Sequence, residues 1–115
     1  MERDPNIFLE DILKSIELIE QYLQNKTKDD FLKFTALQDQ VVRRLEIIGE
    51  AARHMPYELR AQNPAIPWKK IVGTRDHIIH EYFQVDLDIA WETATTGIRK
   101  LKRQILKIKD GLGSK

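Results

Sequence analysis

The chain has 115 residues, of which 42% are hydrophobic and 32% charged; this is the composition of a folded globular domain and excludes a disordered chain. It contains no cysteine, which excludes a disulfide framework, a thiolate metal site and a thiol nucleophile. The formal net charge of +1 does not by itself predict a nucleic-acid partner. No apolar run is long enough to span a bilayer, and the beginning MERDPNIF lacks the layout of a signal peptide. We therefore expect a cytoplasmic protein without membrane association.

The N-terminal part of the sequence carries two signals for the start of a helix. Asp4 and Pro5 are typical of an N-cap followed by proline at the first helical position, and apolar residues then recur at helical spacing to about Asn25. Thr27 and Asp30 resemble a capping box, which predicts that a second helix begins directly afterwards.

The second helix is predicted over residues 28–55 and spans about 42 Å if it is unbroken. Gly49 then marks close packing or a bend, and Pro56 ends the helix. Residues 56–67 hold three of the four prolines, which predicts a connector with at most a short helix.

The C-terminal half predicts a third helix from Trp68, a break near Gln84 and Val85, and a long last helix with Asp86 as its N-cap. We expect the inner face of the last helix to consist of Ile89, Ala90, Thr93, Ile98, Leu101, Ile105 and Ile108. Because strand-like alternation and internal repeats are absent, the sequence predicts an all-α antiparallel bundle of four principal helices. Residues 1–110 form a single domain on this interpretation, and residues 111–115 a flexible tail.

Charge is uneven along the chain, since residues 98–109 carry six Lys or Arg and no acid. The simpler interpretation is a solvated helix face, with basic residues favoured near a helix C-terminus by the macrodipole. A local basic surface that binds a partner is the alternative.

The stretch RDHIIHEYF at residues 75–83 concentrates titratable side chains within the third predicted helix. On one continuous helix from Trp68, Arg75 lies in the middle of the apolar stripe and Tyr82 shares its seam. A buried guanidinium is costly without a partner, so Arg75 must pair with an acid such as Glu46 or Glu50, reach water, or meet a second molecule.

A narrow polar line runs beside the apolar stripe and contains Lys69, Gly73, Asp76 and His80. Asp76 and His80 are four residues apart, so the carboxylate can accept a proton from one imidazole nitrogen and fix the tautomer of the other. Gly73 has no side chain, which leaves room for another backbone or a ligand.

Arg75 and His80 are about 140° apart on that helix, so they converge on one small ligand only if the helix distorts or two copies face each other. The second possibility predicts a homodimer with two arginines and two histidines around a cleft. This set suits cleavage of RNA, because histidine can take the proton of a 2′-hydroxyl, a second histidine can protonate the leaving oxygen, and arginine can hold the phosphate. No metal and no cofactor are required.

Simpler interpretations exist for each residue taken alone. His80 can be an ordinary, partly exposed histidine, and Tyr82 a core aromatic whose hydroxyl reaches water. His77 and His80, with Glu81 beside them, could be metal ligands, but the sequence places no further ligand and His77 is expected to be exposed.

Arg75, His80 and Tyr82 together form an R-x4-H-x-Y motif, and the segments around it are RRLEIIGEAA at 43–52, IPWKKIVGTRDHIIHEYFQVDLDIAW at 66–91 and LKRQI in the last helix. In order and spacing, these segments resemble the HepT-like toxins of the HEPN superfamily over nearly the whole chain. Asp76 departs from the asparagine that is commoner after the arginine.

The resemblance implies a homodimeric four-helix HEPN bundle that acts as a metal-independent ribonuclease toxin, with Arg75 and His80 as catalytic residues and RNA as the substrate. It also implies a nucleotidyltransferase antitoxin as partner, which transfers AMP to Tyr82 and blocks the site. One alternative is a non-catalytic HEPN module that holds a nucleotide or substrate for a partner nucleotidyltransferase, and another is a helical dimerisation scaffold.

Overall fold

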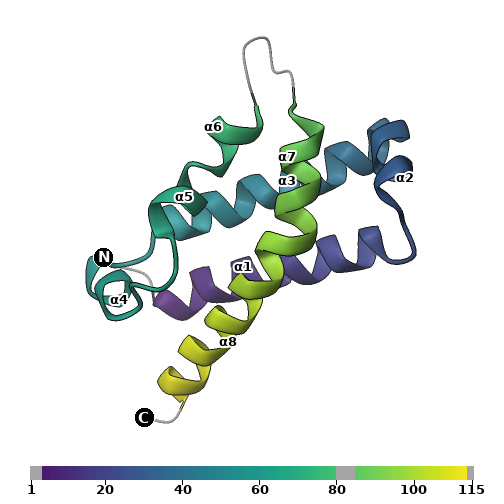
Figure 1. Ribbon diagram of the computed structural model, residues 1–115. Coiled ribbons are helices and arrows are strands. Elements are labelled where there is room, and N and C mark those ends of the chain that lie inside the picture. The colour runs from purple at the N-terminus through teal and green to yellow at the C-terminus, as the bar shows by residue number, and fades with distance from the viewer. Residues whose placement is uncertain (1–3, 80–84, 114–115) are drawn as a thin grey trace.

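The computed structural model describes residues 4–79 and 85–113, and within these ranges the chain is built from helices and connecting turns. In chain order (Figure 1), the elements are α1 Pro5–Leu23, α2 Lys28–Lys33, α3 Thr35–Arg53, α4 Tyr57–Gln62, α5 Trp68–Val72, α6 Thr74–Ile78, α7 Leu87–Glu92, the π-helix η2 Thr93–Gly97, and α8 Ile98–Gly113. The predicted all-α class is confirmed. In the described ranges, every helix is too short or too polar to cross a bilayer.

The predicted helix starts are confirmed by their hydrogen bonds. The Asp4 carboxylate accepts a hydrogen bond from the backbone N–H of Asn6 at 2.9 Å, directly before Pro5. At the start of α2, Thr27 Oγ1 accepts from the Asp30 N–H at 3.1 Å and the Asp30 carboxylate accepts from the Thr27 N–H at 2.8 Å. Asp86 caps α7 by accepting from the Ile89 N–H at 3.1 Å. Each signal is local in sequence, which is why it can be read without a structure.

The prediction of one continuous helix over residues 28–55 is wrong, because Phe34 adopts an extended backbone (φ −110°, ψ 104°) and separates α2 from α3. The break lets α2 turn toward α7. Phe31 is completely buried, with its ring centroid 5.6 Å from that of Trp91, and Lys28 pairs with Asp88 at 2.9 Å. Burial of one large aromatic side chain stabilises by more than continuing the helix through Phe34 would.

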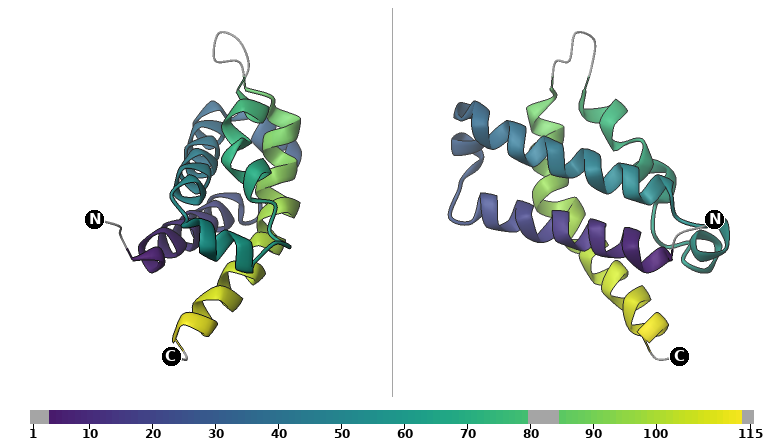
Figure 2. Two further views of the ribbon diagram at one scale, coloured as in Figure 1. Left: turned by 90° about the vertical axis from the view of Figure 1, so that its left-hand side faces the viewer. Right: turned by 180° about the vertical axis from the view of Figure 1, so that it is seen from behind.

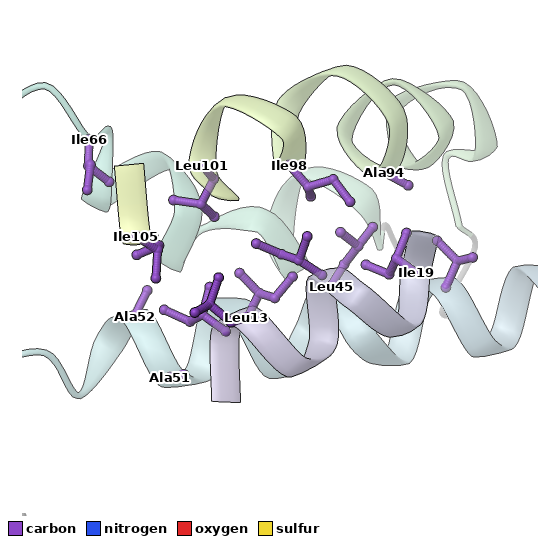
Figure 3. Packing of buried hydrophobic residues seen from close by; sticks show 14 of the residues in the cluster. Leu13, Ile19, Leu45, Ala51, Ala52, Ile66, Ala94, Ile98, Leu101 and Ile105 are labelled. Carbon is purple, nitrogen blue, oxygen red and sulfur yellow. The ribbon is translucent and has the colours of Figure 1, made fainter. Parts of the chain in front are cut away.

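The core lies where α1 and α3 run side by side in opposite directions and the continuous path α7, η2 and α8 crosses them (Figures 1 and 2). Figure 3 shows side chains from all three parts meeting there, among them Leu13, Ile19, Leu45, Ala94, Ile98, Leu101 and Ile105. Two of them, Ile19 and Ile105, have no exposed surface at all, as expected from the 3.6-residue period.

The last helix differs from the prediction near its beginning. Ile98, Leu101, Ile105 and Ile108 are buried as expected, but Ile89 is 39% exposed. The physical reason is that α7 packs through Ala90 and Trp91, and Ile89 lies about 200° from Trp91 around the helix, on its other side. Thr93 is half-buried and donates its hydroxyl to the Ile89 carbonyl at 2.8 Å. At the other end, α8 extends to Gly113, three residues into the stretch predicted as a tail.

Candidate active site

The predicted third helix is interrupted, which changes where its side chains point. Gly73 (φ −82°, ψ 5°) separates α5 from α6, and the last residue of α6 is Ile78. Ile79 is extended and forms an isolated antiparallel bridge with Val85, while the Asp86 N–H donates to the Ile78 carbonyl at 2.6 Å. The helix therefore ends before the predicted break near Gln84, because its last turn bonds to the segment that leads into α7.

Close packing of α5 on α3 sets the position of this segment. A Cβ atom on Gly49 would lie 3.0 Å from the carbonyl oxygen of Ile71, closer than real Cβ atoms normally approach backbone. Gly49 therefore marks close packing and not a bend, since α3 continues through it to Arg53. A Cβ on Gly73 would lie 3.3 Å from the Lys69 carbonyl oxygen and 3.7 Å from His77 Nε2, so the His77 ring lies next to Gly73.

Arg75 is placed beside α3 by this packing. Its Nε lies 3.5 Å from Glu46 Oε2, and its side chain is 60% exposed, whereas the Glu46 side chain is 28% exposed. The prediction that Arg75 lies in the middle of an apolar stripe is wrong, because it assumed one continuous helix from Trp68 without the interruption at Gly73. The charge of Arg75 thus has two of the three partners that were considered for it, namely an acid and water.

Glu50, the other acid considered for Arg75, is used within its own helix. Its carboxylate lies 2.9 Å from Arg53 Nη2 and 3.2 Å from His54 Nε2. The hydrogen bond from Arg53, with a smaller contribution from His54, lowers the pKa of Glu50 below its ordinary value. Glu46 is thus the acid on α3 that faces Arg75.

Lys69, Asp76 and His77 are exposed, as expected for His77. His80 and Tyr82 lie outside the described residues, so the pairing of Asp76 with His80 and the approach of His80 to Arg75 stay predictions. The chain enters the segment 80–84 from Ile79 and leaves it at Val85, the two residues joined by the antiparallel bridge. Sequence reasoning missed this bridge, for which the only signal is the pair of β-branched residues Ile79 and Val85 on either side of HEYFQ.

These features define a class of protein: an all-α protein with an exposed arginine where α6 packs on α3, and with a bridge between the residues that flank segment 80–84. The family model described as Ribonuclease HepT-like matches residues 12–108, so the chain belongs to the HepT-like ribonuclease family.

Three relatives carry matching descriptions. The chain is 50% identical over 112 residues to a Methanocaldococcus jannaschii protein named "Gamma-glutamylcyclotransferase and putative RNase", covering 97% of this chain and 50% of the relative. It is 41% identical over 106 residues to a "Putative RNase" of Caldanaerobacter subterraneus, covering 92% of this chain and 95% of the relative. It is 39% identical over 109 residues to a "Probable ribonuclease HepT" of Thermococcus cleftensis, covering 95% and 99%. The chain thus spans half of the first relative and nearly all of the other two. No solved structure matches the chain.

Proposed function

We propose that the protein is a metal-independent endoribonuclease that acts as the toxin of a toxin–antitoxin pair. The observation that carries the proposal is membership of the HepT-like ribonuclease family over residues 12–108, with Arg75 of α6 exposed to solvent. More than half of the Arg75 side chain is exposed, so the guanidinium is accessible to a ligand.

Arg75 and His80 are the proposed catalytic residues. His80 accepts the proton of the ribose 2′-hydroxyl, whose oxygen attacks the neighbouring phosphorus atom. The bond from phosphorus to the 5′-oxygen breaks, and a second protonated histidine donates its proton to that oxygen. The products are a 2′,3′-cyclic phosphate and a 5′-hydroxyl end. Arg75 binds the phosphate oxygens and stabilises the charge that develops on them. Glu46 lies beside Nε of Arg75, and the terminal nitrogens of the guanidinium are the groups that we propose bind the phosphate.

A homodimer supplies the second histidine in this proposal. Two copies related by a two-fold axis would bring both motif segments to one cleft. Lys69 and Asp76 are supporting residues. The exposed Lys69 adds positive charge for the RNA backbone, and the exposed Asp76 is the acid of α6 that we propose orients the His80 ring. Gly73 supports the site by letting the Lys69 carbonyl and the His77 ring pack closely beside it.

The proposed antitoxin is a nucleotidyltransferase that modifies Tyr82. The tyrosine oxygen attacks the α-phosphorus of ATP, pyrophosphate leaves, and the hydroxyl proton is lost to solvent or a base. The adenylyl group brings a negative charge next to the phosphate-binding arginine, which would oppose RNA binding.

Cleavage of a labelled RNA by the purified protein in the presence of EDTA tests the proposed activity. Arg75→Ala and His80→Ala should each lower kcat/KM by at least about a hundredfold, as for other residues that act in the transition state. His77→Ala and Lys70→Ala are matched controls on the same segment and should cut at the rate of the original protein. Undiminished cutting by His80→Ala would rule out the assigned mechanism.

Expression of the chain in a bacterial host tests the toxin role. Growth should stop on expression of the original chain and continue on expression of either catalytic variant. Growth should also recover when the neighbouring nucleotidyltransferase is co-expressed, and mass spectrometry should then detect one adenylyl group on Tyr82. The alternative, a non-catalytic module that serves a nucleotidyltransferase, predicts unimpaired growth and no cleavage by any variant.

A further inference from the structure

The exposed side of α8 carries a row of cations that the proposed catalytic site does not use. Arg99, Lys100, Arg103 and Lys107 are all exposed, and we call them the basic face. At 100° per residue they fall within about 100° of the helix circumference, and Arg99, Arg103 and Lys107 follow one another every four residues, about 6 Å apart along the axis. The row is therefore a continuous strip of positive charge about 12 Å long.

The remaining two cations of the run lie on another side of the helix and are neutralised by α1. Lys102 Nζ donates to Glu20 Oε1 at 2.8 Å, and Lys109 Nζ donates to Glu10 Oε1 at 3.4 Å. The hydrogen bond to Glu20 raises the pKa of Lys102, which keeps that ammonium charged. The acids of α1 thus compensate one edge of α8, and the only acid in the sequence of α8 itself is Asp110, beyond the end of the strip.

The helix macrodipole does not explain the basic face. Its favourable effect on cations is confined to the last turn of a helix, and the last turn of α8 contains no basic residue. Arg99 and Lys100 lie instead in the middle of the continuous helical path formed by α7, η2 and α8, where the dipole does not stabilise them. A charge pattern that local helix stability does not require points to a partner with negative charge.

We propose that the basic face of α8 binds the phosphate backbone of RNA outside the catalytic site. The proposal deepens the proposed function, since it takes RNA as the substrate, and it assigns the role of substrate anchor to a surface remote in sequence from Arg75. Gln104 Nε2 donates to the Ala65 carbonyl at 3.3 Å, so the α8 edge next to Lys100 meets the connector that leads to Lys69 on α5. Figures 1 and 2 show α8 extending past α1, away from α6, so a bound strand would run along the molecule.

An anionic membrane fits this surface less well. A helix that lies in a membrane interface must insert an apolar face opposite its basic one. The apolar face of α8 is already buried in the core, because Ile98, Leu101, Ile105 and Ile108 are each at most 8% exposed. A polymer of phosphates needs only the charges.

The test measures binding separately from cutting. A fluorescent 2′-O-methyl oligoribonucleotide of about 20 nucleotides, which lacks the nucleophilic hydroxyl, is titrated at several salt concentrations. Arg103→Gln/Lys107→Gln should weaken binding roughly tenfold or more near 0.1 M salt and lower the slope of log K against log salt by about 1.4, or about 0.7 for each lost phosphate contact. The matched control Lys26→Gln/Lys33→Gln removes the same charge from exposed positions around α2 and should bind like the original protein.

Cutting then gives a second readout. With a cleavable RNA of the same length, Arg103→Gln/Lys107→Gln should have a higher KM than the original protein and the same kcat. An RNA of two or three nucleotides, too short to reach the basic face, should be cut equally well by the variant and the original protein. The proposal would be overturned if Arg103→Gln/Lys107→Gln and its control bound the probe with equal affinity and equal salt dependence. It would also be overturned if Arg103→Gln/Lys107→Gln lost binding to anionic phospholipid vesicles but still bound RNA like the original protein. Should the original protein bind the probe through α8 and yet cut no RNA, the proposed ribonuclease activity fails while the RNA-binding face stands.

Discussion

Arg75 and Glu46 show how a single ion pair can matter to chemistry without contributing much to stability. Their 3.5 Å separation and the 60% exposure of the Arg75 side chain place the pair among surface salt bridges, which stabilise by roughly 0–1 kcal/mol. The same contact places a carboxylate beside Nε and so favours guanidinium orientations in which Nε faces α3.

Glu46→Gln should therefore leave the free energy of unfolding nearly unchanged and lower kcat for RNA cleavage roughly tenfold, because Arg75 loses the charged acid that orients its guanidinium. KM should fall, because a negative charge beside the phosphate-binding arginine is removed. Steady-state kinetics check both effects. Glu50→Gln, one turn further along α3, is the matched control and should change neither constant. Equal kcat for Glu46→Gln and the original protein would contradict the prediction.

Gly49 is a second residue whose effect depends on a neighbour distant in sequence. Gly49→Ala should lower the free energy of unfolding by about 1–3 kcal/mol, because its Cβ would lie 3.0 Å from the Ile71 carbonyl oxygen and α5 must move. Gly97→Ala is the control, since its Cβ would meet only Thr93 Cγ2 at an ordinary 3.8 Å; it should stabilise by about 0.5–1 kcal/mol through helix propensity. Urea unfolding measures both, and a stabilised Gly49→Ala would disprove the close approach.

At the scale of elements, the C-terminus of α3 is held by a residue from α4. Arg60 Nη2 donates to the carbonyl oxygens of Ala52 at 2.7 Å and Arg53 at 2.9 Å, both in the last turn of α3; the Ala52 oxygen also accepts from the Met55 N–H at 3.2 Å. A cation at a helix C-terminus is also favoured by the macrodipole. The short α4 thus closes the end of the helix that carries Glu46 and Gly49.

Arg60→Ala should lower the free energy of unfolding by about 2 kcal/mol, the range for hydrogen bonds made by a charged group. Arg53→Ala removes only an exposed pair with Glu50 and should cost less than about 1 kcal/mol. Chemical denaturation of both variants at neutral pH gives the comparison, and equal losses would mean that Arg60 does not cap α3.

The start of α2 predicts a dependence on pH. The Thr27 backbone N–H, and then the Thr27 hydroxyl, lower the pKa of Asp30 below its ordinary value. A carboxyl whose pKa is lowered in the folded state stabilises that state, and the stabilisation is complete when the pH is above the ordinary pKa. It is lost as the pH falls through the lower pKa of the folded state. Asp30→Asn should therefore lower Tm at neutral pH and lose less Tm on acidification than the original protein. Asp29→Asn, in the same turn, should keep the original pH profile.

At the scale of the whole molecule, the proposed dimer has a consequence that neither subunit shows alone. The proposed cleft uses His80 of both subunits, so a dimer of one original and one His80→Ala subunit lacks one of the two histidines. Mixing equal amounts of the original protein and His80→Ala after brief unfolding should lower the cleavage rate to about a quarter of that of the original protein at the same total concentration, because about a quarter of the dimers keep both histidines. A rate of about one half, with native mass spectrometry showing mixed dimers, would mean that each site is built within one subunit.

The sequence by itself determined the all-α class, the three helix starts at Asp4, Thr27 and Asp86, and the buried period of α8, because caps and amphipathic periods are properties of residues within a turn or two of one another. It also reached the family, through the motif around Arg75. Only the tertiary structure decided the break at Phe34, the interruption at Gly73, the outward turn of Ile89 and the exposure of Arg75 beside Glu46. Each of these depends on a contact between segments far apart in the chain, such as Phe31 with Trp91 or Gly49 with Ile71, and no local pattern records which distant surface a helix will meet.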